Sequence, residues 1–114
     1  MKWSPEARLA AARACCARLD GGTLCLYAGE KKAAELRFSD PAFHGDHMNP
    51  IAPDESADGA EGVDNFVALN AKGGLEAEGS CGALGSGADC ELKSVNIPRG
   101  ARVEPESLHF TPGA

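Results

Sequence analysis

Short runs in which apolar side chains occupy every second position constrain this chain more than any other feature. The first run covers residues 23–27 and places Leu24 and Leu26 on one face. The second run covers residues 34–38, in which apolar residues alternate with charged ones. Successive side chains of a strand point to opposite faces, so a period of two is typical of a half-buried strand. The pattern predicts a mainly β fold.

The middle of the chain continues this pattern. Residues 65–69 and 75–79 are two further apolar runs, separated by the turn Lys72-Gly73-Gly74. Two adjacent glycines between apolar runs favour a turn. Residues 81–87 are rich in glycine, and we expect them to form a flexible loop.

The tail predicts two more strands. Residues 89–110 contain two apolar runs on either side of the turn Pro98-Arg99-Gly100. The apolar phase changes between Leu92 and Val95, which indicates a bulge or a bend because a pleated strand keeps its period. No catalytic cluster is visible in this quarter of the chain.

One helix precedes the strands. Ser4-Pro5-Glu6 is a strong helix start, because serine caps free amides and proline suits the first helical position. The helix is expected over residues 5–19, until Asp20-Gly21-Gly22 ends it. Its narrow apolar stripe consists of Leu9, Ala12, Cys16 and Leu19. Alanine-rich helices bury little area, so we expect this one to pack against a flat surface such as a sheet.

These elements define the expected fold class. One N-terminal α-helix (about 5–19) and about six strands predict an antiparallel β-sandwich or small barrel, as a single domain over residues 1–114. A long loop, about 42–62, interrupts the strands and contains prolines and four acidic residues. Loops of this length in compact domains are usually functional or mobile.

Charge and hydropathy exclude two classes of partner. The formal net charge is -6 and the eleven basic residues are scattered, whereas phosphate backbones require clustered lysine and arginine. We therefore expect no nucleic-acid partner. No apolar run has the length of a membrane span, and no export signal is expected at Met1-Lys2-Trp3.

The five cysteines do not form a metal or redox motif. None has C-x-x-C spacing, so we interpret them as reduced thiols, some buried as small apolar groups. Cys81 and Cys90 could face each other across a hairpin, and the sequence leaves open whether they pair.

Two segments partly imitate metal sites. His44, Asp46 and His47 offer two imidazoles and a carboxylate in one loop, which makes them weak candidate metal ligands, although a solvated polar turn explains them better. Residues 54–59 imitate a calcium loop, but its twelfth position is Asn65 and no helices flank it. We expect an acidic surface loop, no metal and no cofactor.

No catalytic residue is assigned. The glycine-rich segment 82–87 contains no lysine and opens no helix, and no nucleophile elbow is present. The sequence therefore predicts a protein that is not an enzyme.

Three segments resemble a group of small proteins encoded among the virion structural genes of tailed bacteriophages and prophages. The first two are residues 19–29, with Asp20-Gly21-Gly22, and residues 36–43, with the strand end Phe38 to Phe43. The third covers residues 94–111. Its matching positions are Gly100, Val103, Ser107, Leu108 and Thr111. Only Glu30-Lys31-Lys32 lies between the first two strands, where the relatives carry a longer loop.

This resemblance implies a non-enzymatic structural component of a tailed bacteriophage virion, made in the bacterial host cytoplasm. A tail, tail-tip or fibre-associated subunit is preferred. The alternatives are a capsid decoration (cement) protein, a host-surface or glycan binding module, and a metal-dependent enzyme built on the two histidines and Asp46.

The expected partners are other virion proteins and further copies of the chain. A thin core with few aromatic residues favours burial of more surface by association. The candidate interface residues are Trp3, Phe43, Ile51, Val67 and Leu69, together with the loop 42–53.

Overall fold

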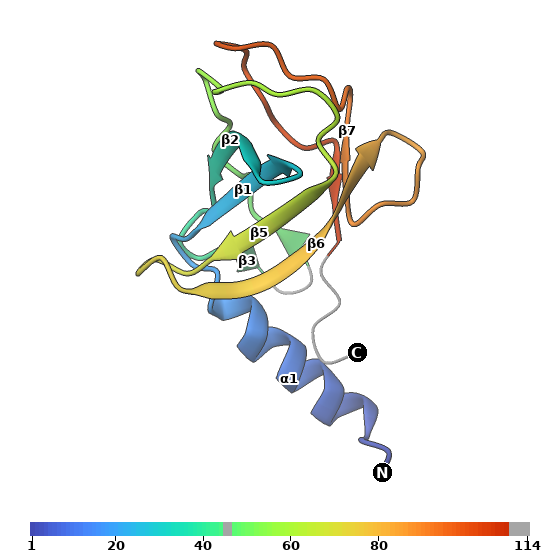
Figure 1. The fold of residues 1–114 in the computed structure, drawn as a ribbon. Helices are drawn as coiled ribbons and strands as arrows, with labels where there is room; N and C mark the ends of the chain where they lie inside the picture. The colour runs from blue at the N-terminus through green and yellow to red at the C-terminus, as the bar shows by residue number, and fades with distance from the viewer. Residues whose placement is uncertain (45–46, 110–114) are drawn as a thin grey trace.

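The computed structural model describes residues 1–44 and 47–109 and contains one helix, one six-stranded sheet and one small hairpin (Figure 1). The elements are α1 (Pro5–Ala17), β1 (Thr23–Ala28), β2 (Lys31–Arg37), β3 (Phe43–His44), β4 (His47–Met48), β5 (Asn65–Leu69), β6 (Leu75–Ala83), β7 (Cys90–Leu92) and β8 (Ser107–Leu108). The predicted mainly β class with an N-terminal helix is confirmed.

The sheet has the order β2-β1-β5-β6-β7-β8 and curls into a half-barrel. All neighbours are antiparallel except β6 and β7, which are parallel. The loop 84–89 carries the chain back alongside the end of β6, so that Cys90 pairs with Cys81. The sheet is therefore mixed, whereas the sequence predicted an antiparallel one.

The core lies on the concave side of the sheet. Leu24, Leu26, Phe66 and Ala68 point into it and are almost fully buried. Full burial of a leucine or phenylalanine side chain contributes about 1.5–3 kcal/mol. Cys25 is buried but lies outside this core cluster, on the opposite face of β1. The faces predicted for the first strand are confirmed.

The long loop and the tail pair with each other along their backbones. Asp54 and Val103 exchange two hydrogen bonds, of 3.0 and 2.7 Å, and Ala60 and Ile97 exchange two more, of 2.9 and 2.8 Å. Ala52 bonds to Arg37 of β2, so this layer continues from the edge of the sheet. The loop also buries Ala57, Ala60 and Val63. Residues 54–63 are thus part of the core structure.

The two strands predicted in the tail are present and pair antiparallel, Cys90 with Leu108 and Glu91 with Ser107, but they are much shorter than predicted. Only β7 and β8 join the sheet, and residues 93–106 between them form no regular strand. The expected bend after Leu92 marks the point where the chain leaves the sheet. Ile97 and Val103 are buried, and they pair with the long loop rather than with each other. Backbone partners so far apart in the sequence leave no local signal.

The predicted flexible loop 81–87 is wrong in its first part, because β6 extends to Ala83. Glycine is needed in this strand for close packing. A Cβ at Gly79 would overlap the Phe66 ring, and one at Gly82 would overlap Ser86. The glycines therefore permit strand contacts here instead of breaking the strand.

The helix begins as predicted, but it does not pack on the sheet. The Ser4 hydroxyl accepts a hydrogen bond of 3.1 Å from the Ala7 amide, and Pro5 occupies the first turn. No residue of α1 is buried, and the helix projects away from the sheet (Figure 1). Along the stripe, exposure rises from 3% at Leu19 to 42% at Leu9. The stripe residues that lie within α1 are Leu9, Ala12 and Cys16. Together they offer too little apolar area to hold the helix against the sheet.

Candidate interaction surfaces

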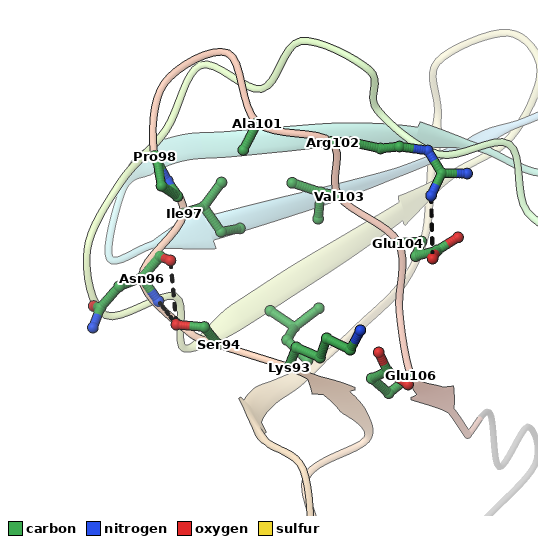
Figure 2. Close-up of a pocket in the computed structure, with 11 residues that line it drawn as sticks. Lys93, Ser94, Asn96, Ile97, Pro98, Ala101, Arg102, Val103, Glu104 and Glu106 are labelled. Atoms are coloured by element: carbon green, nitrogen blue, oxygen red, sulfur yellow. Dashed lines mark hydrogen bonds and ion pairs between the residues drawn. The ribbon is translucent and has the colours of Figure 1, made fainter.

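The tail forms a surface groove with a volume of about 330 Å³ (Figure 2). Leu92, Ile97 and Val103 are its buried apolar residues, and charged side chains lie around them. The pairing of the tail with residues 54–63 holds this groove in shape, because it fixes the backbone on both sides of Pro98. The volume is at the lower end of the range for small-ligand sites, about 300–1,000 Å³.

Two of the four charged side chains that line this groove, Arg102 and Glu104, are paired with each other. Arg102 forms ion pairs with Glu55 and Glu104, both of 3.2 Å (Figure 2 shows the second). The hydrogen bond to Glu55 and the nearby Glu104 charge raise the pKa of Arg102. The Ser94 hydroxyl accepts from the Asn96 amide at 3.1 Å, which stabilises the turn below Ile97.

Hydrogen bonds lower the pKa values of three carboxyl groups. Within residues 1–44 and 47–109, the carboxyl groups with displaced pKa values are Asp64, Glu76 and Glu91, and all three pKa values are lowered. Hydrogen bonds from Gly29, Arg18 and Gly87, respectively, are the main causes. A general acid at neutral pH requires a raised carboxyl pKa, which none of these has.

The two histidines of the weak metal candidate are cross-strand neighbours. His44 in β3 pairs with His47 in β4, and both side chains are exposed. Asp46 lies outside the described residues. Among the residues that the structure describes, no group of three or more histidine, cysteine, aspartate or glutamate side chains is placed to hold a metal ion.

Cys81 and Cys90 are direct neighbours, in parallel strands rather than across the hairpin considered above. Both are buried, with 8% and 0% exposure, and both are free thiols. A hydrogen bond with Cys90, together with burial, raises the pKa of Cys81. A raised pKa keeps a thiol protonated and weakly nucleophilic at neutral pH. Cys81 therefore packs as a small apolar group, whereas the hydrogen bond with Cys81 lowers the pKa of Cys90, which is fully buried.

The predicted interface residues lie in three different places. Trp3 is 64% exposed and precedes α1. Val67 and Leu69 are half-buried on the outer face of the sheet, between β1 and β6. Phe43 and Ile51 pack partly against the core cluster, which leaves them less available to a partner.

Sequence reasoning missed two exposed apolar residues and one ion pair. Leu75 and Leu84 are 57% and 63% exposed, at the start of β6 and just beyond its end. Arg18 and Glu76 form an ion pair of 2.6 Å, which connects the base of α1 to β6. The exposed leucines were visible in the sequence as apolar residues beside glycines. No sequence signal links residues 18 and 76.

Comparison of the chain with models of protein families, with curated proteins and with solved structures finds no significant match in any of the three. Within the described part of the chain, no helix is both long and apolar enough to cross a membrane.

Proposed function

We propose that this protein is a non-enzymatic structural subunit of a tailed bacteriophage virion, associated with the tail, the tail tip or a fibre. The resemblance of residues 19–29, 36–43 and 94–111 to small virion proteins supports this assignment. So does the architecture, in which a small β body carries a helix that contacts almost nothing else among the residues that the structure describes.

The projecting helix is the observation that carries the proposal. A soluble monomer normally covers the faces of its helices, because helices in proteins are stabilised mainly by tertiary packing. Here α1 has no buried residue, its own Leu9 is exposed, and Trp3 just before the helix is exposed as well. A subunit that is completed by its neighbours in an assembly has this form.

The composition of purified particles tests the proposal. Quantitative mass spectrometry of particles from the phage or prophage that encodes the chain should find it in a fixed ratio to a major tail protein. Antibody labelling in electron micrographs should place it on the tail, whereas labelling of the head would favour the capsid decoration alternative. Presence in the lysate but absence from purified particles would overturn the proposal.

A further inference from the structure

The helix and the rest of the chain carry opposite charge. Residues 1–19 contain four basic residues and one acidic residue, for a net charge of +3. Residues 20–114 contain seven basic and sixteen acidic residues, for a net charge of -9. We call residues 1–19 the arm and the remainder the body. The arm, which projects from the sheet in Figure 1, is therefore positively charged, whereas the body is strongly acidic.

The arm is also incomplete as a structural unit. Its helix has 13 residues, and isolated helices below about 12–15 residues are marginal in water even when rich in alanine. Within residues 1–44 and 47–109, the contact between α1 and the body is limited to the base of the helix, where Leu19 is buried and Arg18 forms an ion pair with Glu76. A partner surface along the helix would supply the missing stabilisation.

The exposed area of the chain allows for an interface of ordinary size. The accessible surface is 6995 Å² for a mass of 11.7 kDa, whereas a compact monomer of this mass exposes about 5,900 Å². The excess, about 1,100 Å², exceeds the 800 Å² or so that each partner contributes to a standard interface. The elongated shape, 45 × 27 × 22 Å, agrees with this excess.

We propose that the arm of one copy docks on the acidic body of a second copy of this chain. The proposal rests on the proposed function and specifies the contact through which copies of the subunit associate. Tryptophan and arginine are among the residue types that contribute most to interface energetics. The arm contains Trp3, the only tryptophan of the chain, and the exposed Arg8 and Arg13. The body supplies the complementary charge, which favours encounter in this orientation.

The placement of the arginines favours a protein partner over a membrane or a nucleic acid. Arg8, Arg13 and Arg18 recur at intervals of five residues, so they point in directions about 140° apart around the helix. A flat anionic surface is bound by a helix with its basic residues on one face. In addition, the body with its net charge of -9 would be repelled by an anionic lipid surface or a phosphate backbone.

Two matched variants of the full chain test the docking. Arg8→Glu/Arg13→Glu reverses charge on the arm, and Lys31→Glu/Arg99→Glu reverses two exposed residues of the body with the same change of net charge. Sedimentation velocity at low and at 0.5 M salt measures self-association, and circular dichroism verifies that each variant is folded. Emission of Trp3 reports burial of the arm, because the chain has no other tryptophan.

We expect wild-type chains to associate at low salt, with a shift of Trp3 emission to shorter wavelength as the concentration rises. The arm variant should associate at least about tenfold more weakly, which corresponds to about 1.4 kcal/mol, and should show no shift. The body variant should retain association within about threefold and keep the shift of Trp3, because its reversed charges lie outside the arm.

Three results would overturn the docking. In the first, the two variants associate equally and Trp3 emission is constant. In the second, the wild-type chain stays monomeric at every concentration. In the third, Trp3 shifts only on addition of phosphatidylglycerol vesicles or duplex DNA. Each of these leaves the virion assignment to be judged separately, by the composition of purified particles.

Discussion

Asp54 and Val103 exchange two backbone hydrogen bonds although they are far apart in the sequence. Asp54 also accepts hydrogen bonds of 2.9 Å from the amides of Glu35 and Ser56 through its side chain. One residue thus joins the long loop to the tail and to β2. This relationship explains how a small body with a thin core keeps a defined shape at the edge of its sheet.

Substitution of Ile97 tests the pairing of loop and tail. Ile97→Ala should lower the free energy of unfolding by about 2–4 kcal/mol, because a large buried side chain is removed and a cavity remains. The neighbouring Pro98 is exposed, and Pro98→Ala should cost less than about 1 kcal/mol. Urea denaturation measures both values. Equal effects of the two changes would mean that Ile97 is not part of the core.

The glycine of β6 offers a second test of packing. Gly79→Ala should destabilise the protein by about 1–3 kcal/mol, because the added Cβ overlaps the Phe66 ring. Glu78→Ala, at the adjacent exposed position, is the matched control and should change stability by less than about 0.5 kcal/mol. Thermal unfolding of both variants is the measurement. A neutral Gly79→Ala would contradict the close approach of β5 and β6.

Removal of the helix cap should affect the arm without affecting the body. Ser4→Ala loses the acceptor for the Ala7 amide, which costs about 1 kcal/mol of helix stability. Because no residue of α1 is buried, helicity at 222 nm should fall while the main unfolding transition stays in place. A lowered transition temperature would show that α1 supports the core.

The thiols should differ in their rates of modification. Cys15 is exposed and should react first with a disulfide reagent at neutral pH. Burial raises the pKa of Cys25, and a hydrogen bond with Cys90 together with burial raises that of Cys81, so both should react only after unfolding. Thiol counts with and without denaturant test this. Rapid reaction of four or more cysteines in the native protein would contradict the burial.

The ion pair at the base of α1 predicts a dependence on pH. Arg18 holds the pKa of Glu76 below its ordinary value of 4.5. A carboxyl group whose pKa is lower in the folded than in the unfolded state stabilises the fold. The contribution is complete when the pH is above the pKa of the unfolded state, and it is lost as the pH falls through the pKa of the folded state. Stability measured from pH 6 downward should therefore fall less steeply for Glu76→Gln than for the wild type. Parallel curves would show that the pair contributes nothing.

Local patterns predicted the strands but not their partners. The alternation of Leu24 and Leu26 placed β1 with its correct faces, and β5 was predicted with its bounds, Asn65–Leu69. The serine cap placed the start of α1 correctly. All of these depend on side-chain periods or capping within a few residues, which a sequence displays directly.

Longer-range features were missed for a physical reason. Ala60 and Ile97 pair through backbone groups that every residue has, so side-chain identity does not encode the contact. Glycines of β6 looked like loop residues, although they make room for Phe66 and Ser86. Whether α1 packs on the sheet or projects from it depends on how much apolar area its stripe offers to the body. Helix propensity does not measure that area.

Amide hydrogen exchange of residues 8–17 tests the docking of the arm most directly. At concentrations where the wild-type chain is associated, these amides should exchange more slowly than in dilute solution, while the amides of β1 and β5 exchange at the same rate in both. Arg8→Glu/Arg13→Glu should abolish the difference. Equal exchange of the helix amides in dilute and associated protein would contradict the account.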